Sequence, residues 1–108
     1  MVLDQEVAMA RVGGDEELLR ELAQLFLQEG PRLMAELRAA HSLSDAKGVE
    51  RSAHGLKGSV ANFGAKPAVD AAYQIEQLGR AGKLEAVEET MRTLDLALFA
   101  LNAKLAQL

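Results

Sequence analysis

The segment SDAKGVERSAHGLKGSVANFG, residues 44–64, contains the clearest helical pattern in the chain. Its apolar residues recur at steps of three and four, which places them along one face of a helix. These residues are Ala46, Val49, Ala53, Leu56, Val60 and Phe63. Ser44 is expected to cap the helix, with Asp45 at its start, and Gly64 is a natural stop. The segment is therefore predicted to be a helix with one buried face.

The residues before this segment predict two more helices. A short helix is expected over residues 4–12, with Asp4 as its N-cap and a pair of glycines after it. Asp15 then begins a long helix that runs to about Ala40, with two acidic residues in its first turn, where they favour the helix dipole.

Gly30-Pro31 interrupts the apolar pattern of the long helix, and proline normally kinks or ends a helix. The apolar phase nevertheless continues from Phe26 through Leu33 to Leu37. We therefore expect one bent helix, with two separate helices as the alternative. The residues expected on its core side are Leu18, Leu22, Leu25, Phe26, Leu33 and Leu37.

The residues after the segment predict two further helices. Pro67 opens the first of them, and Gly79 and Gly82 are expected to mark its end. Its buried side is marked by Val69, Ala72, Ile75 and Leu78. The last helix runs from about Leu84 to the C-terminus. Its apolar stripe is Leu84, Val87, Met91, Leu94, Leu98, Leu101, Leu105 and Leu108.

Short connections between long amphipathic helices predict antiparallel neighbours. The expected fold is all-α: an antiparallel four-helix bundle with a short extra N-terminal helix, formed by residues 1–108 as a single domain. A coiled-coil dimer through the last helix is an alternative. We expect a monomer, because four helices in one chain can bury each other's apolar stripes.

The composition argues against several classes of function. The 108 residues contain no cysteine and only two histidines, so neither a disulfide nor a dedicated metal site is expected. A net charge of −4 and an aromatic content of 4% disfavour nucleic-acid binding. No run of about 18 apolar residues that could span a membrane is present, and the first residues lack the basic and continuous apolar regions expected of a signal peptide. We expect a cytoplasmic domain without a cofactor, a nucleic-acid partner or membrane contact.

His54 lies away from the apolar stripe of its helix. At about 100° per residue it points roughly 130° from the centre of the stripe, so it is predicted to face solvent. The residues on the same broad face are Lys47, Glu50, Arg51, Lys57, Gly58 and Ala61. A neutral imidazole is a good nucleophile near neutral pH, and these basic neighbours would suit a phosphoryl group.

Gly55 and Gly58 each destabilise a helix by about 0.5–1 kcal/mol relative to alanine. Gly58, four residues after His54, removes the side chain that would overhang an approach to the imidazole. Gly55 reduces the bulk of the helix surface next to His54. The competing explanation is that these glycines admit a close helix crossing. The other histidine, His41, lies in a connector and is expected to be exposed or to cap a helix.

The sequence His54-Gly55-Leu56-Lys57-Gly58-Ser59, followed by Phe63-Gly64-Ala65, resembles the signature of the histidine-containing phosphotransfer (HPt) domain. That signature is His-x-Leu-Lys-Gly-Ser with a Gly-Ala just beyond the helix. The resemblance covers nearly the whole chain. It implies that His54 carries a phosphoryl group on Nε2, that Lys57 contacts the phosphoryl oxygens, and that Gly58 leaves space for a partner.

The resemblance also implies a residue that orients the histidine. Glu76 lies on the next helix, where similar domains place a Gln or Glu that hydrogen-bonds the histidine or its phosphoryl group. Gln74 and Gln77 are alternative candidates, and a solvated helix face is the alternative interpretation of Glu76. Together with Lys57 and Gly58, the expected docking face around His54 includes Arg51, Ala61 and Asn62.

The function implied is that of a phosphocarrier in a two-component phosphorelay, and not of an enzyme in the usual sense. Its partners would be a response-regulator receiver domain, which supplies Mg²⁺ and an aspartate, and a hybrid sensor histidine kinase. The alternative is a scaffold or dimerisation module that is never phosphorylated. A metal or cofactor bundle is disfavoured because no ligand set is present. A stand-alone protein and a domain of a larger kinase are both open.

Overall fold

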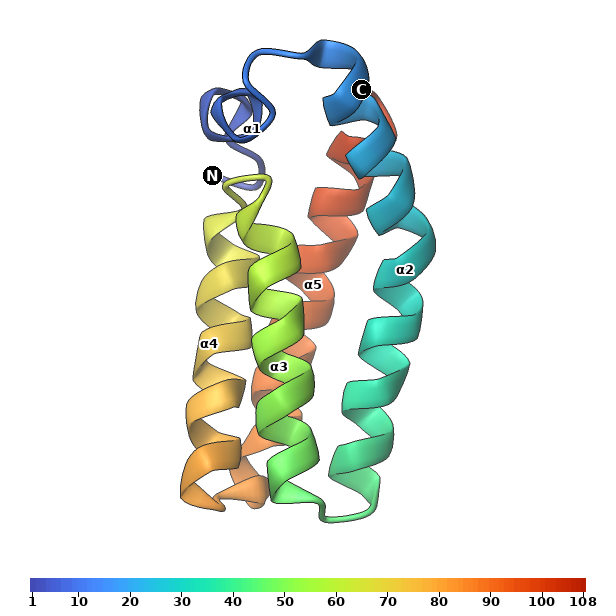
Figure 1. The fold of residues 1–108 in the computed structure, drawn as a ribbon. Helices are drawn as coiled ribbons and strands as arrows, with labels where there is room; N and C mark the ends of the chain where they lie inside the picture. The colour runs from blue at the N-terminus through green and yellow to red at the C-terminus, as the bar shows by residue number, and fades with distance from the viewer.

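The computed structural model describes residues 1–108 and is entirely helical (Figure 1). Its elements are α1 (Gln5–Arg11), α2 (Glu16–Ser42), α3 (Ala46–Ala61), α4 (Lys66–Ala81), the 3₁₀ turn η1 (Leu84–Ala86) and α5 (Val87–Leu105). Helices α2 to α5 run side by side in alternating directions, and the whole chain is a rod of 41 × 20 × 20 Å. Helix α1 lies at the end of the rod where α3 finishes. The expected antiparallel four-helix bundle with a short extra N-terminal helix is confirmed.

Aspartate side chains begin three of the helices. The carboxylates of Asp4, Asp15 and Asp45 accept hydrogen bonds from the backbone N–H groups three residues later. The predicted cap at Asp4 and the predicted start of α2 at Asp15 are confirmed, but the predicted cap at Ser44 is wrong. Ser44 has a left-handed φ of 53°, which belongs to the turn after α2 and differs from the extended backbone of an N-cap. Asp45 is therefore the cap of α3.

Helix α2 continues through Pro31, as expected, and its buried face differs from the predicted one. Leu18 and Leu25 were expected in the core but are 39% and 54% exposed. The residues buried from α2 are Leu19, Ala23, Phe26, Gly30, Met34, Leu37 and Ala40. Helices α3 and α5 pack against α2, whereas Leu18 and Leu25 lie on an exposed side of it.

The core is built from the stripes that the sequence predicts on α3 and α5. All the named α3 residues except Ala46 are buried, and Phe63 meets the Phe26 ring edge-on at a centroid distance of 5.9 Å. On α5, the predicted residues from Val87 to Leu105 are buried. None of the helices combines the length and the apolar character needed to cross a membrane.

Two connecting features differ from expectation. Gly79 does not end α4 but lies buried within it, and Gly82, with a left-handed φ of 71°, is the residue after the helix. His41 is the last-turn residue of α2 and is half-buried, with its Nε2 atom 3.0 Å from the carbonyl oxygen of Leu84. His41 therefore ties the end of α2 to η1 instead of facing solvent freely.

Candidate functional site

His54 lies in the middle of α3 with its side chain 67% exposed, which confirms the predicted solvent-facing position. The Nδ1 atom of His54 lies 3.0 Å from Oε2 of Glu76 on α4. An ionised carboxylate can only accept a hydrogen bond, so Nδ1 carries the proton and donates it. Nε2 is then the unprotonated nitrogen of the neutral ring. The arrangement leaves this nitrogen as the nucleophilic atom.

Glu76 is buried, with its side chain only 5% exposed, so the interpretation of Glu76 as part of a solvated face is wrong. Three nitrogen-bearing side chains surround its carboxylate. Oε2 faces His54 Nδ1 at 3.0 Å and Arg80 Nη2 at 3.4 Å, and Oε1 faces Lys57 Nζ at 2.7 Å. Glu76, and neither Gln74 nor Gln77, is thus the residue that contacts the histidine.

The environment of Glu76 favours its ionised form. Burial alone raises the pKa of the Glu76 carboxyl. The hydrogen bonds from Lys57 and His54, together with the positive charge of Lys57, outweigh this effect and lower the pKa below its ordinary value. A buried carboxylate is tolerated here because cationic groups compensate it. Glu76 therefore stays a hydrogen-bond acceptor for His54 over the neutral pH range.

Lys57 is held by α4 and does not extend freely into solvent. Its side chain is only 25% exposed, and its Nζ lies 2.7 Å from Glu76 Oε1 and 5.1 Å from the ring centroid of Tyr73. The ammonium thus sits next to the histidine's carboxylate partner, on the same side of the bundle as His54. Sequence reasoning missed Tyr73. Its position three residues before Glu76, on the same face of a helix, was the available signal.

Arg80 is a second neighbour that sequence reasoning missed. Its Nε lies 2.7 Å from Oε2 of Glu50 on α3, while its Nη2 faces Glu76. The hydrogen bond and the charge of Glu50 raise the pKa of Arg80 above its already high ordinary value. The spacing of four residues from Glu76 is the helical signal that would have found it. Arg80 therefore links α3 to α4 at the edge of the site.

The remaining predicted residues lie on the two sides of His54. Gly58 is exposed, and a Cβ built there would meet no atom within 4 Å. Arg51 lies on the other side, in a shallow hollow that also contains Lys47 and Arg80. Ala61 and Asn62 lie at the end of α3, roughly 10–12 Å along the helix from His54. They neighbour the site without touching the imidazole.

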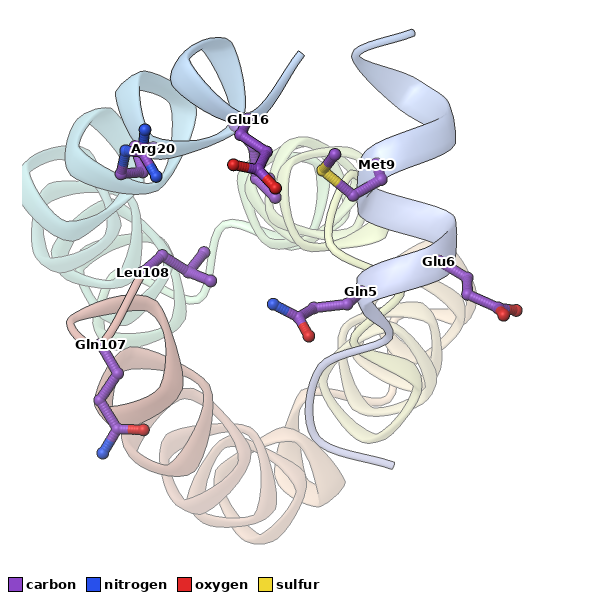
Figure 2. A pocket seen from close by; sticks show the side chains of 8 residues that line it. Gln5, Glu6, Met9, Glu16, Arg20, Gln107 and Leu108 are labelled. Carbon is purple, nitrogen blue, oxygen red and sulfur yellow. The ribbon is translucent and has the colours of Figure 1, made fainter. Parts of the chain in front are cut away.

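A separate hollow lies at the end of the bundle, between α1, the start of α2 and the C-terminus (Figure 2). Its lining residues are Gln5, Glu6, Met9, Glu16, Leu19, Arg20, Gln107 and Leu108. None of them belongs to the cluster around His54. No group of three His, Cys, Asp or Glu side chains in the structure is placed to hold a metal ion.

Comparison with known proteins agrees with the helical-bundle fold. The family model of the Hpt domain matches residues 21–108. A solved structure, the crystal structure of histidine-containing phosphotransfer protein B (HptB) from Pseudomonas aeruginosa PAO1, superimposes with a TM-score of 0.90. It is 22% identical, and the match covers 97% of this chain and 91% of that one. No curated protein sequence matches the chain. Since the family model covers most of the chain, the protein belongs to the Hpt family, the histidine phosphotransfer domains of phosphorelays.

Proposed function

We propose that His54 is the phosphoacceptor of this domain and that it exchanges a phosphoryl group with the aspartate of a response-regulator receiver domain. The observation that carries the proposal is the combination of an exposed imidazole with a buried carboxylate on its Nδ1 atom. This combination leaves Nε2 unprotonated and accessible to a partner. His41, the other histidine, is half-buried and has no carboxylate partner.

The chemistry is a phosphoryl exchange between nitrogen and oxygen. The Nε2 lone pair of His54 attacks the phosphorus of an aspartyl phosphate, an N–P bond forms, the P–O bond breaks, and the aspartate leaves as a carboxylate. Nδ1 keeps its proton, so the phosphorylated ring carries a positive charge that the Glu76 carboxylate offsets. The reverse reaction delivers the phosphoryl group to a receiver. Mg²⁺ and the aspartate belong to the receiver in both directions.

The surroundings of His54 support this role. Gly58 leaves open space one helical turn from the imidazole, where a larger side chain would meet an approaching partner. Lys57 is close enough to the site to reach phosphoryl oxygens by rotating about its side-chain bonds. The docking face would combine these residues with Arg51, Ala61 and Asn62, and its basic groups complement the acidic pocket of a receiver.

The partners proposed are a receiver domain and a hybrid sensor histidine kinase, and the domain would act as a monomer in the cytoplasm. It would act as a phosphocarrier, with no cofactor of its own. The positioned nucleophile is its contribution to the transfer, while the receiver contributes the metal-assisted chemistry.

Phosphotransfer from a labelled receiver tests the assignment. The chain is incubated with a phosphorylated receiver domain and Mg²⁺, and acid-labile, alkali-stable label is followed over time. We expect the wild type and the control His41→Gln to take up label and His54→Gln to take up none. Labelling of His54→Gln at the wild-type level would refute the site. A wild type that takes no label from any receiver would favour the unphosphorylated scaffold.

A further inference from the structure

The aromatic ring of Tyr73 makes a contact in the site that phosphoacceptance by itself does not explain. Tyr73 lies on α4, half exposed, with the Lys57 ammonium 5.1 Å from its ring centroid. The same ammonium is 2.7 Å from Oε1 of Glu76. Tyr73 and Glu76 are three residues apart and so lie on one face of α4. Together they confine the end of a long and flexible side chain.

The two partners of Lys57 hold it with different strength. Glu76 is buried, and Lys57 is the group that faces its Oε1 atom, so removing the ammonium would leave a buried carboxylate oxygen unpaired. The attraction of a half-exposed ring for a cation is weaker. An ammonium has three donors and can contact Glu76 and a second anion together. Lys57 can therefore give up its contact with the Tyr73 ring while it keeps its contact with Glu76.

We propose that Tyr73 is a positioning residue for phosphotransfer: its ring keeps the Lys57 ammonium beside Glu76 and His54 while the phosphoryl group is transferred, and releases it once the phosphoryl group is bound to Nε2. This inference rests on the proposed role of His54. Without the ring, the ammonium would spread over more conformations and lie near the site for a smaller fraction of the time. With the ring, the cation is already close when transfer begins.

The composition of the chain provides a direct probe of this contact. Tyr73 is the only tyrosine and the chain has no tryptophan, so its intrinsic tyrosine fluorescence comes from one ring next to Lys57. Phosphoramidate can phosphorylate the imidazole without a receiver, because ammonia leaves as the N–P bond forms. Movement of Lys57 away from the ring can therefore be followed separately from docking.

The experiment compares Tyr73→Leu, which removes the ring, with Tyr73→Phe, which keeps it. The control is Phe99→Leu, which removes an aromatic ring that is 79% exposed on α5. We expect Tyr73→Leu to slow label uptake from the receiver by about two- to fivefold, the factor expected from cation–π attraction at an exposed site. Tyr73→Phe and Phe99→Leu should transfer at about the wild-type rate.

Two spectroscopic readouts test positioning itself. Protons over the face of an aromatic ring are shifted upfield, so the Lys57 side-chain methylene signals next to Nζ should move downfield in Tyr73→Leu and stay in place in Tyr73→Phe. Phosphorylation of the wild type with phosphoramidate should shift these signals in the same direction as Tyr73→Leu and should change the Tyr73 fluorescence. The Tyr73→Phe protein is the fluorescence blank.

The outcomes separate this inference from the proposed function. Wild-type transfer in Tyr73→Leu, or equal slowing in Tyr73→Leu and Tyr73→Phe, would overturn the role of the ring while leaving His54 as the phosphoacceptor. Unchanged Lys57 and Tyr73 signals in labelled wild type would overturn the release of the cation. A wild type that takes no label on His54 from any donor would overturn the proposed function and the inference together.

Discussion

Gly55 and Gly58 are the residues of α3 that most need a physical reason, because each lowers the stability of the helix. Both are exposed, and a Cβ at either position would meet no atom within 4 Å. A close helix crossing therefore does not explain either of them. Gly58 shares the face of His54, so access for a partner remains the proposed explanation of this glycine. Gly55 has no contact in the structure that requires a glycine.

Replacing Gly58 by alanine should separate stability from transfer. We expect Gly58→Ala to raise the free energy of unfolding by about 0.5–1 kcal/mol, since alanine is the better helix former and nothing obstructs its methyl group. Label uptake from a receiver should slow, while labelling by the smaller phosphoramidate should not. Gly55→Ala is the matched control, with the same gain in denaturant unfolding. Equal transfer rates for both variants would argue against the access role of Gly58.

The ionisation of Glu76 makes a pH-dependent contribution to stability. Its folded-state pKa lies below the ordinary value of 4.5, so the stabilisation is complete above that pH and is lost as the pH falls through the folded pKa. We expect the free energy of unfolding of wild type, relative to Glu76→Gln, to decrease on acidification. Urea unfolding from about pH 7 to about pH 3 measures this difference. A difference that stays constant with pH would contradict the prediction.

At the scale of elements, the contact between α3 and α4 determines the geometry of the site. His54, Lys57 and Glu50 come from α3, and their partners Glu76 and Arg80 come from α4. Gly79 lets the two backbones approach, because a Cβ there would lie only 2.8 Å from the backbone nitrogen of Glu50. This close approach next to Arg80 brings the buried carboxylate of Glu76 within reach of the imidazole.

Gly79→Ala should therefore disturb the packing of α3 on α4. The added methyl group meets backbone atoms that cannot rotate away, and we expect a loss of about 1–3 kcal/mol in the free energy of unfolding. Denaturant unfolding measures the loss, and Gly58→Ala, on the facing helix but in open space, is the control. The His54–Glu76 hydrogen bond should weaken as well, visible in the nitrogen chemical shifts of the imidazole. A stabilised Gly79→Ala protein would refute the close packing.

At the scale of the whole molecule, the bundle supports the site without depending on it. His54 is exposed on α3, whereas Leu56, two residues later, is fully buried in the core between the helices. Two positions close together on one helix thus differ in their role: the side chain of Leu56 stabilises the folded bundle, whereas the side chain of His54 contributes little to its stability. The proposed phosphotransfer site lies on the outer face of α3, whereas the residues that stabilise the bundle lie on its inner face.

Substitutions at these two positions should have opposite consequences. Leu56→Ala should lower the free energy of unfolding by about 2–5 kcal/mol, because it leaves a cavity in the core. His54→Gln should change it by less than about 1 kcal/mol while abolishing label uptake. Thermal or urea unfolding followed by circular dichroism gives both values. Severe destabilisation by His54→Gln would show that the site and the bundle are not separable.

The features predicted correctly from the sequence are local ones. The cap at Asp4, the helix start at Asp15, the stripe from Val49 to Phe63 and the exposed position of His54 each follow from residues within about one or two turns of one another. The wrong predictions concern residues whose backbone conformation or burial depends on neighbouring elements. Asp45 caps α3 in place of Ser44, because Ser44 adopts the left-handed conformation of the turn after α2. Leu25 is exposed because no helix covers its side of α2.

The sequence by itself determined that this chain forms amphipathic helices, that they form a bundle, and that a histidine with a lysine and a glycine lies on an outer face. Only the tertiary structure decided that Glu76 is buried against His54, and that Lys57 lies between Glu76 and Tyr73. The physical reason is the range of the interactions. Helical periodicity acts over a few residues, whereas the contacts of Glu76 depend on how closely two helices pack, which Gly79 controls across the interface.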